Sequence, residues 1–171
     1  MKPIKFPEAN VTFGENQPQF EPLPAYLSPN GIVVSCWVLT PEVAQLLAQV
    51  RWLAPIKFGC DSPKQIGTCE KAMSLIDSYA KTPRSYLLFT IIMGDIQECY
   101  ERISYFKSFS RVRVHAQPMR EFDNPRQIIP QWQKDMARWS DRKELYRSID
   151  FKEFQPRKGF ICNEYFKDLE K

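Results

Sequence analysis

The sequence contains no long hydrophobic run, and this absence limits where the chain can act. No stretch of about eighteen consecutive apolar residues occurs, so the sequence predicts no membrane-spanning helix. The first residues, MKPIKFPEAN, lack the apolar core of a secretion signal. The five cysteines do not have the spacing of a disulfide framework. Together these absences predict a cytoplasmic protein with free thiols.

The motifs that identify common enzyme classes are also missing. The sequence has no Walker loop and no HExxH, GxSxG or CxxC motif, and its one histidine is His115. A nucleophilic pair of His115 with Cys99 or Cys69 stays open, as does a zinc site from Cys60, Cys69 and His115. A lone histidine on a strand is more often structural, however, and Cys36, Cys69 and Cys99 fall on apolar stripes typical of core residues. We therefore assign no catalytic residue and no metal ligand.

What the sequence does contain is an uneven distribution of positive charge. The net charge is +4, yet residues 111–158 alone hold twelve Lys and Arg against seven Asp and Glu, a net of +5. Such a region attracts phosphates, so one predicted function is a small interaction module that binds nucleic acid, or a protein partner, through residues 111–158. The alternative is a solvated helix surface, because Asp135, Asp141 and Glu144 lie among the basic residues.

The clearest structural pattern lies in residues 85–116. SYLLFTIIM (85–93) is apolar on both faces, as expected for a central parallel strand that is covered on each side. Gly94 marks a turn, and Asp95 caps a helix whose apolar residues repeat every three or four positions. RVRVHA (111–116) alternates between small apolar and polar side chains. Strand, helix and strand have the length of a right-handed parallel crossover, which predicts an α/β fold.

The flanking segments predict further elements. Residues 1–30 hold six prolines and several aromatic residues, which predicts an extended arm held on a surface by its aromatic side chains. The next patterns predict a strand at 32–39, a helix from Thr40-Pro41 to about Leu53 and a loop at 55–67. A helix capped by Thr68 is predicted at 69–81. Another helix is predicted to begin at Pro130, and the residues on its buried edge are Ile129, Trp132, Met136 and Trp139.

Several of these segments resemble a known family. IIMGD followed by an amphipathic helix resembles the fifth strand–helix turn of radical S-adenosylmethionine (radical SAM) enzymes, and RVRVHAQPMREF is similar to their sixth strand and the loop after it. IIPQWQKDMARWSDRKELYRSIDFKEF and PRKGFICNEYF resemble the C-terminal end of short radical SAM proteins of bacteria and phages. The resemblance covers about residues 68–167. Residues 1–57, with KPIKF, VTFGENQP and SCWVLT, resemble short uncharacterised bacterial and phage proteins and imply no function.

The resemblance implies a partial parallel (βα)6 barrel that holds a [4Fe–4S] cluster and S-adenosylmethionine. It also implies that the S-adenosylmethionine site includes Gly94, Asp95, Arg113, His115 and Gln117, with Gly94 and the strand end His115–Gln117 near the adenosine. The alternation along the strand independently places Arg113, His115 and Gln117 on one polar face, which suits the lumen of a barrel.

The chain departs from this family in its cluster ligands. The family binds its cluster through Cys-x3-Cys-x2-Cys on one loop. Here the cysteines are 24, 9, 30 and 63 positions apart, at Cys36, Cys60, Cys69, Cys99 and Cys162. The first strands of the barrel have no counterpart either. We therefore expect an incomplete half-barrel and a truncated, non-catalytic radical-SAM-like protein that retains part of an S-adenosylmethionine pocket. A cluster assembled from scattered thiols is a minority alternative.

The two resemblances divide the chain into an arm with a strand–helix piece (1–57) and a partial radical-SAM-like α/β region (58–171). An incomplete barrel exposes a sheet edge that can pair with other chains. We therefore expect either that the arm and the strand at 32–39 cover this edge, or that the chain self-associates or binds a partner that supplies the missing strands.

Overall fold

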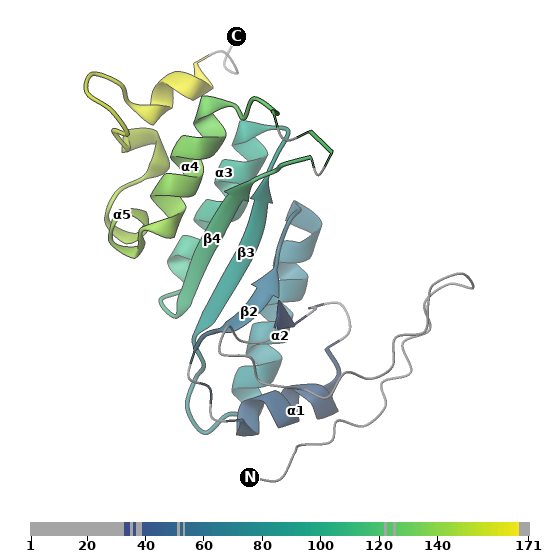
Figure 1. Ribbon diagram of the computed structural model, residues 1–171. Helices are drawn as coiled ribbons and strands as arrows, with labels where there is room; N and C mark the ends of the chain where they lie inside the picture. The colour runs from purple at the N-terminus through teal and green to yellow at the C-terminus, as the bar shows by residue number, and fades with distance from the viewer. Residues whose placement is uncertain are drawn as a thin grey trace.

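A computed structural model of the 171-residue chain describes residues 33–34, 36, 39–50, 52, 54–121, 123–124 and 126–167. The arm predicted for residues 1–30 lies outside the described residues. The described part is an α/β structure in which a parallel sheet packs against helices, so the predicted fold class is confirmed (Figure 1). No described helix is both long enough and apolar enough to cross a bilayer.

Four parallel strands form the sheet: β1 (Val33–Val34), β2 (Ile56–Gly59), β3 (Tyr86–Ile92) and β4 (Val112–Pro118). They lie side by side in chain order, and each is hydrogen-bonded to the next. The register places Phe89 of β3 between Gly59 of β2 and His115 of β4. Because side chains alternate along each strand, aligned residues point to the same face and form rows across the sheet.

The described residues also form five α-helices: α1 (Pro41–Gln49), α2 (Pro63–Tyr79), α3 (Ile96–Tyr105), α4 (Gln131–Asp141) and α5 (Lys143–Ser148). Right-handed crossovers between neighbouring parallel strands place their helices on the same side of a sheet. In Figure 1, α2 and α3 accordingly lie behind the sheet, and α4 runs beside β4 and also contacts α3. Helix α1 packs against α2.

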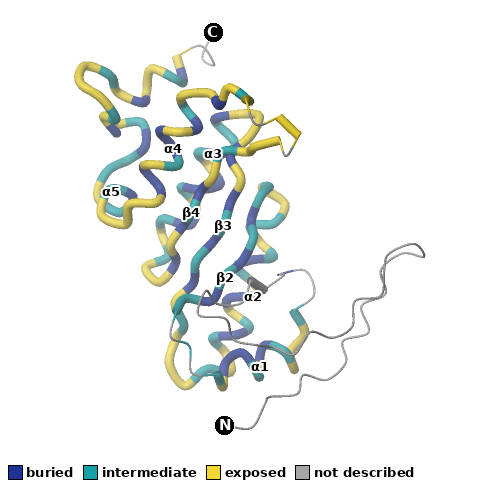
Figure 2. The backbone as a smooth tube through the Cα atoms, viewed as in Figure 1, coloured by how far each residue is buried: buried dark blue, intermediate teal, exposed yellow. Residues whose placement is uncertain are grey.

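The strands bury one face and leave the other accessible. Every second residue of β3 from Tyr86 to Ile92 is buried. Val112, Val114 and Ala116 of β4 are likewise buried, as the alternation predicted. The side chains between them are half-buried or exposed, so Figure 2 shows the strands changing colour from one residue to the next. The described residues before and after position 57 contribute to one hydrophobic core.

The outer edge of β4 is closed by side chains of α4 and α5. Arg111 O accepts from the Tyr86 N–H, so the backbone groups of the even-numbered residues of β4 point away from β3. The Arg147 guanidinium donates to Val112 O at 2.5 Å, and the Ala116 N–H donates to the Asp141 carboxylate. Another strand could pair here only by displacing these contacts.

Several predicted boundaries are confirmed, whereas the first helix is shorter than expected. Asp95 caps α3 by accepting the Glu98 N–H at 2.8 Å, and α4 begins directly after Pro130. Helix α1 ends at Gln49, whereas the pattern predicted about Leu53. The chain turns away at Val50, and Trp52 Nε1 donates to Leu47 O at 2.7 Å.

The loop predicted at 55–67 is wrong, because this segment contains β2 and the first turn of α2. Ile56 and Phe58 are fully buried, and Ile56 N–H donates to Ser85 O at 2.9 Å. Helix α2 begins at Pro63 rather than after Thr68, and the Ser62 N–H donates to Gln65 Oε1 at 3.1 Å. This reciprocal contact is one half of a capping box.

Two expectations about the strands also need correction. The strand predicted at 32–39 is present in the described residues only as Val33–Val34. Strand β3 was expected to be covered on both faces, but the described helices cover one face only, and Ile91 on the other face is 40% exposed.

Candidate functional site

The accessible face of the sheet, which we call the open face, carries three rows of side chains. The amino-terminal row is Lys57, Leu87 and Arg113; the middle row is Gly59, Phe89 and His115; and the carboxyl-terminal row is Ile91 and Gln117. Arg113, His115 and Gln117 therefore share one face, as the alternation predicted. The middle row has one position without a side chain, Gly59, and the space that a Cβ would occupy there is open.

His115 is oriented by two polar partners. Its Nδ1 lies 2.8 Å from Asp141 Oδ1 of α4, and its Nε2 lies 2.8 Å from the Gln117 amide nitrogen. Because a carboxylate can only accept, these partners assign the hydrogen to Nδ1, so that Nε2 accepts from Gln117. The ring also meets the edge of Phe89, with 5.1 Å between centroids. His115 is therefore held in one orientation on the open face by Asp141, Gln117 and Phe89.

Asp141, the last residue of α4, reaches this group with a side chain that is 37% exposed. Burial raises the pKa of its carboxyl, while the attraction of His115 and the Ala116 N–H oppose that rise. The same carboxylate thus joins the edge of β4 to the His115 ring. Sequence reasoning placed Asp141 only among charges of a helix surface and missed this contact, since residues 115 and 141 lie on different elements.

Gly94 and Asp95 follow the carboxyl end of β3. Gly94 has φ +69°, a conformation that favours glycine. The Asp95 side chain is occupied as the cap of α3. The Met119 N–H donates to Ile92 O at 3.0 Å, so the loops after β3 and β4 leave the sheet together. Gln117 therefore shares the carboxyl end with Gly94, whereas Arg113 lies four residues upstream, about 13 Å along the strand.

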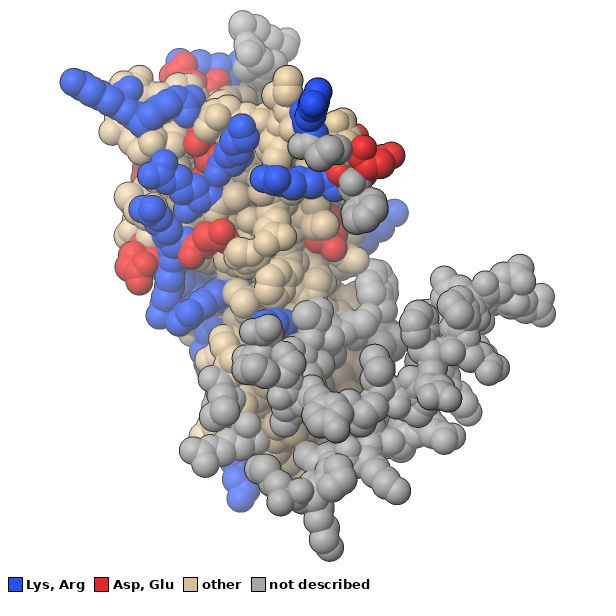
Figure 3. Space-filling view, in the orientation of Figure 1, with Lys and Arg blue, Asp and Glu red and all other residues tan. Residues whose placement is uncertain are grey.

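Exposed apolar side chains surround the carboxyl end. Ile91 is 40%, Met93 45% and Met119 42% exposed. Figure 3 shows a strip of uncharged surface in the middle of this face, between charged residues on both sides. Exposed apolar side chains that gather beside polar groups are typical of a surface that binds a ligand or a partner.

Three cysteines from separate elements come together on the covered side of the sheet. The thiol sulfurs of Cys36 and Cys69 are 3.2 Å apart. A hydrogen bond with Cys69 and burial raise the pKa of Cys60, and the hydrogen bond with Cys36 contributes most to raising the pKa of Cys69 to about 12. Cys60 and Cys69 therefore stay protonated at neutral pH, whereas cluster ligands are thiolates.

Among the described residues, the protonated thiols of Cys60 and Cys69 do not fit the thiolate ligands of an iron–sulfur cluster. Within the part of the chain that the structure describes, no three His, Cys, Asp or Glu side chains are arranged to hold a metal ion. His115 contacts Asp141 and Gln117 on the open face, so it takes part neither in the zinc site nor in the nucleophilic pairs that the sequence left open. Cys99 instead contacts the Arg102 guanidinium.

Arg102 links α3 to the carboxyl ends of β2 and β3. The side chain is 2% exposed, and Nη1 donates to Cys60 O at 2.9 Å and to the Thr90 hydroxyl. Nε and Nη2 contact the Glu98 carboxylate, with Nε at 2.6 Å from Oε1. This buried cation fixes the backbone beneath the candidate site and does not reach the open face.

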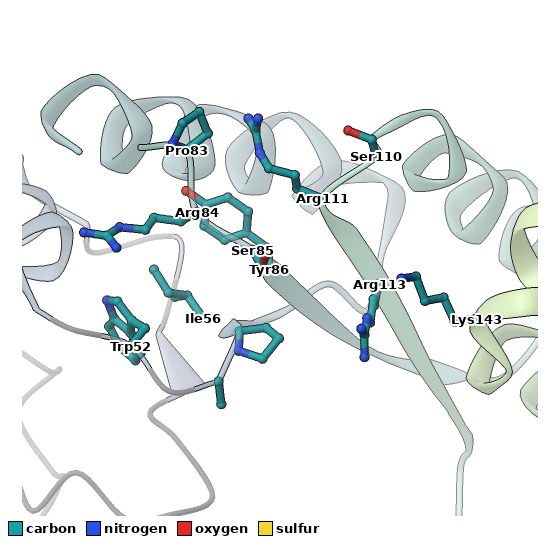
Figure 4. Close-up of a pocket in the computed structure, with 12 residues that line it drawn as sticks. Trp52, Ile56, Pro83, Arg84, Ser85, Tyr86, Ser110, Arg111, Arg113 and Lys143 are labelled. Atoms are coloured by element: carbon teal, nitrogen blue, oxygen red, sulfur yellow. The ribbon is translucent and has the colours of Figure 1, made fainter. Parts of the chain in front are cut away.

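A pocket lies at the opposite, amino-terminal end of the sheet. It has a volume of about 500 Å³ and is lined from the loops before β2, β3 and β4 and from the start of α5 (Figure 4). Trp52, Arg84 and Lys143 line it together with Arg111 and Arg113. Sequence reasoning missed the pocket, because residues 52, 84 and 143 belong to separate segments.

The basic residues of 111–158 divide into two groups. Several serve the fold: Arg147 donates to Phe109 O and Val112 O, Arg157 pairs with Asp135 at 2.8 Å, and Arg138 donates to Pro156 O. Arg111 pairs with Asp77, and Lys152 lies over the rings of Tyr100 and Phe166. Seven of the twelve make no ion pair or side-chain hydrogen bond within the described residues: Arg113, Arg120, Arg126, Lys134, Arg142, Lys143 and Lys158. Part of the predicted basic surface is thus structural, and part remains available to a ligand.

Comparison with known proteins found no match to the chain among family models, curated proteins or solved structures.

Proposed function

We propose that the chain binds S-adenosylmethionine, or a ligand with the same adenosyl group, at the carboxyl end of the open face, and does not use it for cluster-based radical chemistry. The observation that carries the proposal is that Gln117, which contacts His115, and the Gly94 turn share this end of the sheet with exposed apolar side chains. In parallel α/β structures, ligands bind beyond the carboxyl ends of the strands.

The arrangement of the sheet supports this proposal. Strands in sequential order, with their crossover helices on one side, are also the pattern of a segment of a parallel barrel, whose other face lines the lumen. The open face corresponds to that lumen. The residues that the resemblance assigned to the adenosine, His115 and Gln117, lie on it.

The side chains at this end suit a nucleoside. The Gln117 amide offers a donor and an acceptor to a purine edge, and Phe89 and Ile91 provide apolar surface for its ring. Arg113, farther along the strand, suits the carboxylate of the methionine group. Asp95 contributes through the α3 cap rather than by contact, because its carboxylate is already occupied.

Calorimetric titration with S-adenosylmethionine, S-adenosylhomocysteine and methionine tests the proposal. We expect the first two ligands to bind and methionine alone to bind much more weakly. Gln117→Ala should weaken binding by about tenfold, the loss of one well-placed hydrogen bond. Gln155→Ala, at an exposed residue of the C-terminal loop, is the matched control and should bind as the unaltered chain does. Absence of heat with both adenosyl ligands would refute the proposal.

A second candidate function is binding of nucleic acid through residues 111–158. It is favoured by the seven basic side chains that make no ion pair within the described residues. Fluorescence anisotropy with a labelled single strand, measured from 50 to 200 mM salt, gives the number of phosphates that are contacted. Binding at low salt that weakens steeply with added salt is expected; no binding at the lowest salt removes this candidate.

A further inference from the structure

The amino-terminal pocket has an excess of positive charge. Among the described residues, its lining includes Arg84, Arg111, Arg113 and Lys143 and no acidic side chain. The positive charge of Arg111 is neutralised by Asp77, which does not line the pocket; Arg111 Nη2 lies 3.1 Å from Asp77 Oδ2. The other three cations have no carboxylate partner among the described residues. Cations gathered in one concave site raise the local potential and attract an anion.

Two of these cations are free to bind a ligand. Arg113 and Lys143 are both exposed, and Figure 4 shows them on the same side of the pocket, beside the start of β4. Arg84 is more constrained: its Nη2 donates to Ala48 O, and its Nε is buried without a hydrogen-bond partner. A buried donor without a partner costs free energy, which an added acceptor recovers. The Ser85 and Ser110 hydroxyls line the same pocket and can donate as well.

The other side of the pocket is apolar and flat. Trp52 lies across the pocket from Arg113 in Figure 4, with Ile56 between them. Pro55 and Pro83 also line the pocket. The hydrogen bond from Trp52 Nε1 to Leu47 O, 2.7 Å long, fixes the orientation of the indole ring. A fixed aromatic ring suits a planar ligand group, because stacking then requires no ordering of the side chain.

From these features we infer that the amino-terminal pocket binds a nucleotide phosphate: the phosphate at Arg113 and Lys143, and the base at the Trp52 side. The volume of about 500 Å³ is within the range of small-ligand sites. The phosphate can belong to a free nucleotide or to the end of a nucleic-acid strand, since both offer the same chemistry. The site is at the opposite end of the sheet from the proposed adenosyl site, and it goes beyond general electrostatic attraction to residues 111–158.

Titration of the full chain with AMP, adenosine, ribose 5-phosphate and inorganic phosphate tests both parts of the ligand. We expect AMP to bind most tightly, and adenosine and ribose 5-phosphate each to bind at least about tenfold more weakly, the effect of losing one strong contact. If AMP does not bind, the inference is wrong. If inorganic phosphate binds as well as AMP, the pocket is a simple anion site and the assignment to nucleotides is wrong.

The variants distinguish the pocket from the general field of the protein. We expect Lys143→Gln to lower the affinity for AMP by about tenfold. The double variant Arg113→Gln, Lys143→Gln should lower it by more than tenfold. Lys134→Gln, Lys158→Gln removes the same charge from two exposed residues outside the pocket and should leave AMP affinity within about twofold at 150 mM salt. Equal losses in both double variants would overturn the inference. Circular dichroism checks that each variant is folded.

A pair of oligonucleotides identifies the source of the phosphate. If the site accepts the ends of nucleic-acid strands, a short single-stranded oligonucleotide with a 5′-phosphate should compete with AMP. The same oligonucleotide without the 5′-phosphate should not compete. If neither strand competes while AMP binds, the pocket accepts free nucleotides only. Calorimetry with S-adenosylmethionine on Lys143→Gln reports the adenosyl site separately, because Lys143 does not lie on the sheet.

Discussion

Replacing Arg102 tests the buried contact on which the candidate site rests. Arg102→Met keeps most of the apolar stem and removes the guanidinium, which is 2% exposed. The change leaves Cys60 O, Ile91 O and the Thr90 hydroxyl without their donor. It also leaves Glu98, 30% exposed, without its cation. Breaking a buried ion pair from one side costs about 3–5 kcal/mol.

This loss is large compared with the stability of a typical domain, about 5–15 kcal/mol. For a domain of this size, 1 kcal/mol shifts the melting temperature by about 2–4 °C, so we expect a decrease of about 10 °C. Urea denaturation followed by circular dichroism measures the free energy of unfolding. Arg102→Lys should lose less, because an ammonium keeps the charge but cannot reach both the carbonyls and Glu98.

The control is Lys134→Met, at an exposed residue of α4 that has no ion pair among the described residues. A surface change of this kind should alter stability by less than about 0.5 kcal/mol. If Arg102→Met costs less than about 1 kcal/mol, the guanidinium does not hold α3 to the ends of β2 and β3, and the reasoning is refuted.

Three further predictions concern individual residues. Treatment with diamide, a thiol oxidant, should join Cys36 and Cys69, whose sulfurs are 3.2 Å apart, and peptide mapping should find that disulfide before any other. Burial raises the pKa of Tyr100 and Tyr165 to about 12 each. The free energy of folding that their protonated hydroxyls contribute should therefore be present below pH 10 and be lost as the pH rises through 12. Tyrosinate absorbance measures the titration. Gly94→Ala should cost about 1–2 kcal/mol in thermal unfolding, because its φ of +69° is strained for alanine although the added Cβ has open space.

Much of the central unit could be predicted from local sequence. Alternation in RVRVHA identified the buried face of β4, and Asp95 before an amphipathic segment identified the start of α3. These features depend on neighbours in the sequence, so a pattern reveals them. The start of α2 was accessible in the same way, because Ser62-Pro63 followed by Gln65 is a capping signal that the interpretation of 55–67 as a loop overlooked.

Other features depend on contacts between distant residues. Strand β2 follows Pro55 and ends at Gly59, and its conformation is stabilised by hydrogen bonds to β3 that the local sequence does not show. The pocket is similar: Trp52, Arg84 and Lys143 meet only because the three loops leave the same end of the sheet. Asp141 beside His115 is a third case, since α4 must first pack along β4.

The two ends of the open face differ in chemistry, as the two proposed ligands require. The carboxyl end carries uncharged donors and apolar side chains, Gln117 and Ile91 among them, whereas the described residues that line the pocket at the amino end include cations and no acids. Arg113 lies between them and lines the pocket from the open face. A ligand at one end would therefore change the charge available to the other. The edge of β4 is occupied by Asp141 and Arg147, so a partner that adds strands to the described sheet must approach on the β1 side.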